Sequence, residues 1–568
     1  MGHSTSDVQI SVSEYIVKSL INHGVKDVFG YPGGMVTYLL DSLRKYKSSI
    51  CTHICCDERA AAFAACGYAQ VSQNVSVAFS TSGPGATNLI TGIANAYYDS
   101  IPVLFITGQV NTFEQKGDLK ILQRGFQETD VVSMVSEITK KAYSVASADQ
   151  VPIVLNEAFV VCQSDRKGPV LIDLPMDIQK KLISDEDLNC IPRFFQKNNV
   201  PFFSDVSIMI KNSKRPCILV GGGIKQTSLK ENLVKQLGKV SVPIVSSMIA
   251  VDVCNTLPTY YGFIGAYGSR VANFIISKCD LLLVLGSRLD VRQVGANRCN
   301  FAPKAQIIRI DIDERELDYK VHNDELGICA SISQVIECGL LSNFEDYSEW
   351  IKICEDIRNR LNHLDHNPPV DTLNKILRKI NCECIITTDV GQNQVWVAQA
   401  LPKSCKCTIL FSGGLGAMGY AIPSAIGAHY ASGCPILCIV GDGGFQMSLA
   451  ELNTISSKKI PITIILVNNL SLGMIRHFQE MFFNGEYFGT VDDGGYNPIS
   501  GVPIARAFGI NAQKLNDIDD FELHSEPFLY ELTTDKNTYV VPKLEYGKPN
   551  DDQSPQIDRT LYGYLSAL

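Results

Sequence analysis

The sequence predicts an α/β protein made of three doubly wound domains, each built on a parallel sheet. Short runs rich in Val and Ile recur along the chain, and a helix-like stretch separates each run from the next. Continuous apolar strands that alternate with helices are typical of parallel sheets covered on both faces. A chain of 568 residues is also longer than one hydrophobic core usually organises. The predicted strands include residues 75–79, 103–107, 170–173, 217–220, 281–285, 307–310, 436–440 and 462–467.

Two polar stretches that contain proline divide this pattern into thirds. Residues 185–201 and 342–369 are therefore the predicted linkers. The polar end of the chain has no packing period, so we expect it to be mobile or to cover another subunit. The predicted parts are a first domain at 1–190, a middle domain at 195–345, a third domain at 365–545 and a tail at 546–568.

Charge and cysteine usage exclude several classes of function. The net charge is only −9 and no basic block occurs, so nucleic acid is not an expected partner. The 19 cysteines are scattered through apolar runs, which predicts reduced thiols, no structural zinc and a reducing, cytoplasmic location. No stretch approaches 18 uninterrupted apolar residues, and the N-terminus lacks the features of a secretory signal, so neither membrane spanning nor secretion is expected.

A phosphate and metal motif lies in the last third. The strand at 436–440 runs directly into Gly441-Asp442-Gly443-Gly444, and glycines at a strand-to-helix turn let backbone N–H groups approach phosphate oxygens. Asn469 follows the next strand, 27 residues after Asp442. One strand–helix–strand unit returns both residues to the same edge of a parallel sheet, where carboxylate and amide oxygens suit Mg²⁺.

This spacing resembles the thiamine-diphosphate enzyme family, whose signature is Gly-Asp-Gly, then about 25 to 30 residues, then Asn-Asn. A lone Gly-Asp-Gly is also common in structural turns, so the assignment depends on the matched Asn-Asn. By the resemblance, Asp442 and Asn469 hold Mg²⁺ and the Ser471 carbonyl is the backbone ligand. Gly443 and Gly444 would line the diphosphate. The first, middle and third domains would then be pyrimidine-binding, FAD- or nucleotide-type, and diphosphate-binding.

The family also needs a carboxylic acid against N1′ of the cofactor's pyrimidine. Glu58 lies in Cys56-Asp57-Glu58-Arg59, just before a helix-forming run, and resembles the family's catalytic glutamate. The alternative is a solvated carboxylate at a helix start, favoured by the helix dipole. The flanking sequence favours the catalytic interpretation, because two segments near Glu58 also match the family. These are Tyr31-Pro32-Gly33-Gly34 before it and Ser82-Gly83-Pro84-Gly85 after it. By the same resemblance, Gly33 would lie in the catalytic site with Glu58.

Two further segments resemble the remaining walls of the cofactor site. Met418 would be the bulky residue beneath the bent cofactor, and the Gly416 carbonyl would accept from N4′. The alternative is that Met418 is core filler, the usual role of methionine. Gly391, Gln392 and Asn393 would contact the diphosphate edge; Asn393 is a departure, since acetolactate synthases carry histidine there.

The resemblance covers about residues 12–532 and is closest to the catalytic subunit of acetolactate synthase. It implies a donor pocket lined by Phe126 and Gln127, and an acceptor side shaped by Met474 and Phe478. Phe478 replaces the family's tryptophan, which alters the acceptor pocket. The resemblance also implies a homodimer or homotetramer, with Glu58 and Gly33 from one subunit and Asp442 from its neighbour.

Segments of the middle third resemble those that hold FAD in acetolactate synthases. They contain Gly221, Gly222, Arg288 and Asp311, and strand-end glycines beside an acidic residue suit a dinucleotide. An empty, degenerate domain is the alternative.

The leading hypothesis is an enzyme, a transferase or lyase, that decarboxylates pyruvate or another 2-keto acid and joins the acetyl unit to a carbonyl acceptor. One alternative acceptor is a keto-sugar nucleotide in a sugar-biosynthesis pathway. Simple decarboxylation is a second alternative, but it commonly uses adjacent histidines, and none of the 9 histidines form a pair. A non-catalytic nucleotide-binding regulator is a third, disfavoured by the intact site residues.

Overall fold

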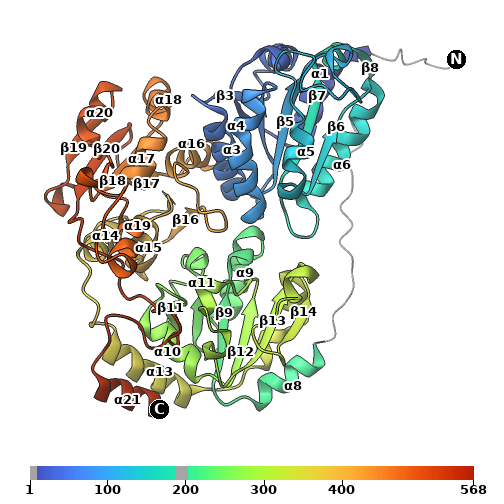
Figure 1. Cartoon of the computed structure of the whole chain (residues 1–568). Helices are drawn as coiled ribbons and strands as arrows, with labels where there is room; N and C mark the ends of the chain where they lie inside the picture. The colour runs from blue at the N-terminus through green and yellow to red at the C-terminus, as the bar shows by residue number, and fades with distance from the viewer. Residues whose placement is uncertain (1–8, 186–187, 189–202) are drawn as a thin grey trace.

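Three six-stranded sheets organise the part of the chain that the structure describes, residues 9–185, 188 and 203–568 (Figure 1). In this computed structural model, all neighbouring strands within the three sheets are parallel. The predicted α/β class and its three parallel-sheet domains are confirmed. Most of the first predicted linker lies outside the described residues.

The first domain, blue to cyan in Figure 1, buries its central strands along their whole length. Its strands, in spatial order, are β3 (Cys51–Ile54), β2 (Asp27–Gly30), β4 (Ser76–Ser80), β5 (Val103–Gln109), β7 (Val170–Pro175) and β6 (Lys141–Ser144). Its helices are α1 (Val12–Asn22), α2 (Thr37–Lys45), α3 (Glu58–Ser72), α4 (Pro84–Tyr98), α5 (Val131–Val135), α6 (Val151–Gln163) and α7 (Met176–Gln179). A separate antiparallel pair joins β1 (Gln9–Ser11) to β8 (Leu182–Ser184).

The middle domain, green to dark yellow in Figure 1, has the same architecture. Its strands, in spatial order, are β11 (Tyr260–Phe263), β10 (Ile244–Ser246), β9 (Pro216–Val220), β12 (Leu281–Leu285), β13 (Gln306–Asp311) and β14 (Leu326–Cys329). Its helices are α8 (Ser204–Asn212), α9 (Lys230–Leu237), α10 (Arg270–Lys278), α11 (Val291–Val294), α12 (Ile332–Glu337) and α13 (Ser348–Leu361). Strands β9 and β12 are buried throughout, as continuous apolar runs require.

The third domain repeats the arrangement once more. Its strands, in spatial order, are β16 (Cys407–Phe411), β15 (Cys384–Thr388), β17 (Ile436–Gly441), β18 (Ile462–Asn468), β20 (Phe528–Thr533) and β19 (Asn511–Lys514). Its helices are α14 (Pro368–Arg378), α15 (Gln392–Ala400), α16 (Ala421–Ser432), α17 (Asp442–Met447), α18 (Glu451–Lys458), α19 (Gly473–Phe482) and α20 (Gly501–Ala507). In the first and third domains the first strand of the sheet lies between the next two strands of the chain, and in the middle domain the first strand, β9, lies between β10 and β12. Such a reversal of strand order opens a crevice at the carboxyl edge.

Helices α3 and α16 join the first domain to the third through small residues. A Cβ on Gly67 would lie 2.3 Å from the Ser424 carbonyl oxygen, and one on Gly427 would lie 1.8 Å from the Ala64 oxygen. The backbones therefore approach more closely than larger side chains would allow. Gly67 meets Ser424, whereas the earlier Ala64 meets the later Gly427, so the two helices are antiparallel.

The stretch predicted as the second linker is partly helical. Its helix α13 buries Trp350, Cys354, Ile357 and Leu361 against the middle-domain core. These apolar residues recur every three or four positions, so they form one buried stripe on a polar helix. The high polarity of the rest of the segment obscured this pattern.

The tail, which was expected to be mobile or to cover another subunit, packs on its own chain. It crosses the middle domain of its own chain and ends in α21 (Arg559–Ala567), which buries Leu565 there. The Arg270 guanidinium donates to the carbonyls of Gln553 and Pro555, and Lys278 donates to that of Ser566. Side chains of the middle domain thus satisfy tail carbonyls, which no periodicity within the tail could indicate.

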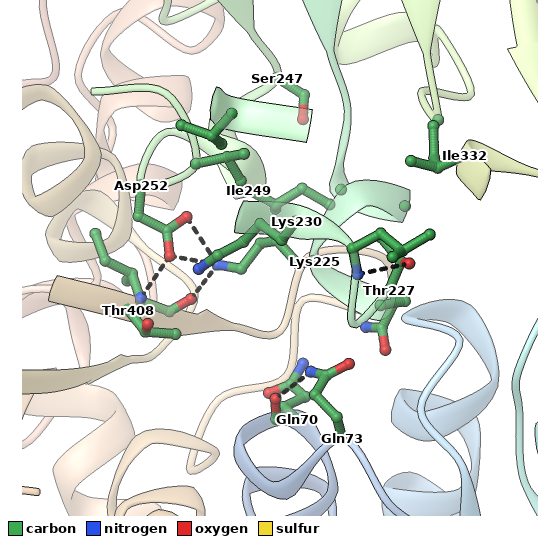
Figure 2. A pocket seen from close by; sticks show the side chains of 18 of the residues that line it. Gln70, Gln73, Lys225, Thr227, Lys230, Ser247, Ile249, Asp252, Ile332 and Thr408 are labelled. Atoms are coloured by element: carbon green, nitrogen blue, oxygen red, sulfur yellow. Dashed lines mark hydrogen bonds and ion pairs between the residues drawn. The ribbon is translucent and has the colours of Figure 1, made fainter. Parts of the chain in front are cut away.

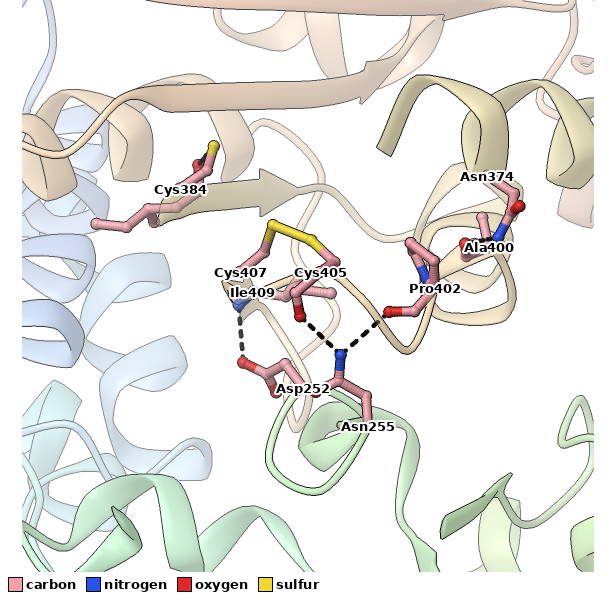
Figure 3. The surroundings of a disulfide bond; sticks show 10 residues. Asp252, Asn255, Asn374, Cys384, Ala400, Pro402, Cys405, Cys407 and Ile409 are labelled. Carbon is pink, nitrogen blue, oxygen red and sulfur yellow. Dashed lines mark hydrogen bonds between the residues drawn. A yellow bond between two sulfur atoms is a disulfide. The ribbon is translucent and has the colours of Figure 1, made fainter. Parts of the chain in front are cut away.

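The prediction of reduced thiols is wrong for one pair. Cys405 and Cys407, at the start of β16, form a disulfide with a Cα–Cα distance of 5.4 Å (Figure 3). The carbonyl of Cys405 also accepts a hydrogen bond from Asn255 of the middle domain. The other cysteines of the described residues are free. Chain spacing alone did not indicate the pair, because a disulfide depends on how the turn into β16 orients the two side chains.

Candidate active site

Asp442, Asn469 and Ser471 meet at the carboxyl edge of the third sheet. Asp442 follows β17, Asn469 follows β18, and these two strands are neighbours. The Ser471 amide donates to Asp442 Oδ2 at 3.0 Å and to Asn469 Oδ1 at 3.2 Å. Leu470 adopts a left-handed backbone with φ of 56°, which turns the chain sharply between Asn469 and Ser471. The predicted metal ligands therefore lie close together, linked through the Ser471 amide.

The Asp442 carboxylate is buried and rich in donors. Burial raises its pKa to about 6, while hydrogen bonds from the amides of Gly443 and Ser471 and from the Tyr496 hydroxyl oppose that rise. A buried carboxylate with a raised pKa gains from a nearby cation, because the cation offsets the cost of desolvating the charge. The Ser471 carbonyl accepts from the Gly473 amide at 2.9 Å and retains a second lone pair. These oxygens are suitable ligands for Mg²⁺.

The glycines of the turn have no space for side chains. A Cβ on Gly443 would lie 2.6 Å from Met418 Cε, and a Cβ on Gly444 would lie 1.7 Å from Asp389 Oδ2. Met418 therefore packs against the turn that follows Asp442. The Gly443 amide donates to Asp442 Oδ1 at 3.0 Å, so the turn also orients the predicted metal ligand.

The segment from Gly391 to Asn393 begins α15, across the crevice from β17. Gly391 has φ of +134°, which only glycine adopts readily. Gln392 Oε1 accepts from Asn469 at 2.8 Å, so it orients one of the predicted metal ligands. Asn393 points into the fold, where its amide donates to Thr388 Oγ1 and to the Asp389 carbonyl, both at 3.1 Å. In place of an imidazole, this side chain secures the end of β15.

The Met418 segment is glycine-rich and precedes α16. Gly416 has φ of +70°. The Asp389 carboxylate accepts from the amides of Gly419 and Ala421, and burial raises its pKa to about 6. Sequence reasoning missed Asp389. The only signal was an acidic residue directly after an apolar strand and before Gly391.

Glu58 begins α3 in the first domain and is only 8% exposed. Asn88 donates to its Oε2 at 3.0 Å, and the backbone of Gly85 passes close to its Oε1. The alternative of a solvated carboxylate at a helix start is therefore wrong. Acidic side chains are almost never buried without a partner, and Asn88 provides one here.

Gly33 and Gln127 lie around the loop at residues 81–85, beside Glu58. A Cβ on Gly33 would lie 2.4 Å from that of Thr81, and one on Gly83 would lie 2.8 Å from that of Gln127. Gln127 has φ of 65°, so its backbone is held in a sparsely populated conformation. Phe126, by contrast, is 81% exposed.

The predicted acceptor residues are on α19, which begins beside the predicted metal ligands. Met474 packs partly against the third-domain core. Phe478 is 51% exposed, and its ring lies 4.5 Å from that of Phe482 and 6.2 Å from that of Phe483. Phe478, Phe482 and Phe483 are all more than half exposed, so these three rings form an apolar surface on the outside of the chain.

Within one chain, Glu58 and Met418 lie near opposite ends of the α3–α16 contact. Glu58 begins α3, whereas Met418 precedes the first turn of α16. Tyr420, next to Met418, donates to Gln70 near the far end of α3. The two predicted halves of the cofactor site are therefore displaced from each other along the helices.

A cavity of about 1420 Å³ lies where the three domains meet. Gly222, Arg288 and Asp311 line it, whereas Gly221 packs behind it with its Cα facing Gly286. The Ser247 hydroxyl lines the wall without a hydrogen-bond partner among the described residues. Its labelled side chains come from all three domains (Figure 2).

Two charged groups join the domains around this cavity. Lys225 is within 2.9 Å of Asp252 and donates to the Ile409 carbonyl in the third domain (Figure 2). Arg166 of the first domain pairs with Asp311 at 2.9 Å and Asp313 at 3.2 Å. Asp311, predicted as a cofactor residue, is therefore already in an ion pair.

Comparisons with known proteins match each domain separately. Residues 10–134 match the N-terminal TPP binding domain of thiamine pyrophosphate enzymes, residues 204–338 the central domain, and residues 389–540 the C-terminal TPP binding domain.

Curated relatives match over nearly the whole chain. The chain is 34% identical to acetolactate synthase isozyme 2 large subunit of Escherichia coli, over 96% of this chain and 99% of the relative. Acetolactate synthase large subunit of Lactococcus lactis is 34% identical over 95% and 96%. A probable acetolactate synthase large subunit of Methanocaldococcus jannaschii is 34% identical over 92% of each chain.

Proposed function

The chain belongs to the thiamine pyrophosphate enzyme family, close to the acetolactate synthase large subunits, and on that premise we propose that it decarboxylates pyruvate and joins the acetyl unit to a carbonyl acceptor. The observation that carries the proposal is the cluster of Asp442, Asn469 and Ser471 beside a glycine turn and Met418. That combination suits a metal-bound diphosphate with a ring held above it.

The donor set fits the cofactor. Asp442, Asn469 and the Ser471 carbonyl would hold Mg²⁺, and Gly443 and Gly444 would line the diphosphate. When bound, thiamine diphosphate supplies a nucleophilic carbon and an electron sink that accepts the electron pair released when CO₂ leaves. The buried setting of Asp442 strengthens its interaction with a cation, because water screens the charges less there.

Glu58 would act on the other end of the cofactor. Its carboxyl group would hold a proton at N1′ of the pyrimidine, and Asn88 would keep the carboxyl oriented for that contact. Low exposure excludes bulk water from this proton, which favours repeated transfer between the same two atoms. Gly33 leaves room for close approach beside Thr81.

We also propose that two copies of the chain complete each site, in a homodimer or a tetramer of such dimers. The displacement of Glu58 from Met418 along the antiparallel helices supports this arrangement. So do the exposed apolar side chains that flank each half-site, Phe126 in the first domain and Phe478 on α19. Each would be covered by a partner across a two-fold axis.

The cavity of the middle domain suits FAD as a bound, non-reacting group. Its volume accommodates a dinucleotide, and it opens at the reversal of strand order between β9 and β12. The unpaired Ser247 hydroxyl is a hydrogen-bond donor for such a ligand. The absorption spectrum of the purified protein would reveal a bound flavin directly.

The decisive experiment offers pyruvate to the purified protein with thiamine diphosphate and Mg²⁺. CO₂ release is measured, and products are read by mass with pyruvate, 2-ketobutyrate or a keto-sugar nucleotide as acceptor. We expect CO₂ and a product that contains the acetyl unit. Acetaldehyde as the sole product would replace carboligation with simple decarboxylation, and no CO₂ would overturn the choice of donor.

Among the described residues, no helix combines the length and apolar character needed to cross a membrane. We propose a cytoplasmic location, supported by the predominance of free thiols in the described part of the chain.

A further inference from the structure

The segment at residues 412–421, which we call the wedge segment, carries Gly416 and Met418 and has little rigidity of its own. Glycine occupies positions 413, 414, 416 and 419. Glycine has more backbone freedom than any other residue, so a segment with four of them needs external contacts to hold one conformation. Two carboxylates supply such contacts, one on each side of Met418.

Asp389 holds the part that follows Met418. Its side chain is fully buried and accepts from the Gly419 amide at 2.8 Å and the Ala421 amide at 2.5 Å. The same carboxylate occupies the space where a side chain on Gly444 would lie. One group therefore contacts both the wedge segment and the glycine turn predicted to line the diphosphate.

Asp99 holds the part that precedes Met418, and it belongs to the first domain. Its carboxylate accepts from the Gly413 amide at 3.0 Å and the Gly414 amide at 2.7 Å. One turn earlier, Asn95 accepts from the Ser412 hydroxyl at 2.6 Å, and that hydroxyl accepts from the Ala417 amide at 2.8 Å. The end of α4 thus fixes the first half of the wedge segment.

Hydrogen bonds to an ionised carboxylate are roughly twice as strong as those between neutral groups. Both ends of the wedge segment are held in this way, and Met418 lies between them against Gly443. We propose that Asp389 and Asp99 are positioning residues that set the distance of Met418 from the diphosphate turn. The inference rests on the proposed function, since it concerns the wall on which the cofactor would bend.

Asp99 also gives the first domain a second role. Its Glu58 would serve a site shared with a neighbouring chain, whereas its Asp99 acts on the wedge segment of its own chain. A shift of the first domain would therefore move Met418 as well.

The test substitutes each carboxylate by the amide of equal size. Asp389→Asn and Asp99→Asn place an NH₂ group where backbone N–H groups need an acceptor. We expect turnover of pyruvate to fall about 10- to 100-fold, the scale of a small misplacement of reacting groups. We expect the dissociation constant for thiamine diphosphate with Mg²⁺, measured by calorimetry, to rise less than turnover falls.

A spectroscopic readout separates positioning from general loss of stability. The near-ultraviolet circular dichroism of the bound cofactor should change per mole bound in both variants, since it reports the cofactor's conformation. The matched control is Asp280→Asn in the middle domain, whose carboxylate also accepts two backbone N–H bonds, from Lys214 and Arg215. The control should leave turnover and the dichroism signal unchanged.

A double variant tests whether the carboxylates act through Met418. If the carboxylates act through this side chain, Asp389→Asn in a Met418→Ala background should cost less than about 3-fold more turnover, because contacts that act as a unit are not additive. Normal turnover and dichroism in a folded Asp99→Asn protein would overturn the inference, even if Asp389→Asn failed to fold. Equal losses in the Asp280 control would overturn it too. A wild-type chain that binds no thiamine diphosphate would instead overturn the proposed function.

Discussion

At the residue scale, the buried side chain of Glu58 carries the most specific chemical expectation. Its carboxyl group is held by Asn88 at the start of α3, whereas Met418 of the same chain precedes α16, near the other end of the α3–α16 contact. Gripping a diphosphate and relaying a proton are therefore assigned to different residues, and substitutions should separate them.

We expect Glu58→Gln to lower turnover by about 100-fold or more while the cofactor still binds with nearly normal affinity. The amide keeps the shape and a hydrogen bond but cannot relay a proton, and about 100-fold is the lower end of acid–base contributions. Steady-state kinetics at saturating cofactor and calorimetry measure the two effects. Asp442→Ala is the comparison variant, because it should weaken the binding of Mg²⁺ and cofactor before it affects turnover at saturating cofactor. Near-normal turnover of Glu58→Gln would remove this residue from the mechanism.

A second expectation at this scale concerns pH. Asp173 is buried between Thr107 and Gln109, which donate to it at 2.6 Å and 2.9 Å, yet burial raises its pKa to about 7. Between pH 4 and 7 the folded chain binds this proton and the unfolded chain does not. Stability from this group is therefore lost as pH rises through that window.

Asp173→Asn should remove that dependence, because the amide stays neutral and can still pair with Thr107 and Gln109. We compare the melting temperature of the variant minus that of wild type at the two pH values. We expect this difference to be about 2–4 °C higher at pH 8 than at pH 5, which corresponds to roughly 1 kcal/mol. Thermal scans at both pH values measure this. The exposed Asp493→Asn should show no such difference, and an equal difference in that control would contradict the assignment to Asp173.

At the scale of elements, the antiparallel contact of α3 with α16 determines how the first and third domains meet. It is built from glycine and alanine at Gly67, Gly427 and Ala64, so its geometry tolerates no added volume. Helix propensity alone would favour alanine over glycine at these positions. The close approach of the two backbones reverses that preference.

Gly427→Ala should therefore destabilise the chain by about 1–3 kcal/mol, the usual cost of overpacking. Its new methyl group would meet the Ala64 carbonyl oxygen. Gly563→Ala in α21 is the matched control, because its Cβ would meet no atom within 4 Å and should stabilise slightly. Thermal denaturation of the two variants compares them. If both variants were more stable than wild type, the α3–α16 contact would accommodate the added methyl group at no cost, and the prediction would be wrong.

At the scale of the whole molecule, the proposed sharing of sites between copies predicts complementation. Glu58→Gln and Asp442→Ala should each be nearly inactive alone. A heterodimer of the two carries both defects in one site and neither in the other. Random mixing makes about half of the dimers heterodimers, so about one quarter of wild-type activity should return. Activity of co-expressed, co-purified variants measures this, and no recovery would place each site within one chain.

Much of the candidate site could be predicted because its elements are close in sequence. Asp442 and Asn469 are one strand–helix–strand unit apart, and right-handed parallel connections leave little choice about where they meet. Apolar runs likewise predicted the strands. Polar segments were less informative: α13 and the tail were misjudged because their partners are in the middle-domain core.

The sequence by itself determined the α/β class, the three parallel sheets, the cluster around Asp442 and the family, since each depends on local patterns of burial and on short-range spacing. Only the tertiary structure decided which distant residues meet. Asp99 and Gly413 are separated by more than half the chain, and no motif marks their hydrogen bond. The direction of α16 along α3 and the inward turn of Asn393 are of the same kind. Such contacts are selected by shape and by satisfaction of buried polar groups across the whole fold, which a linear pattern does not encode.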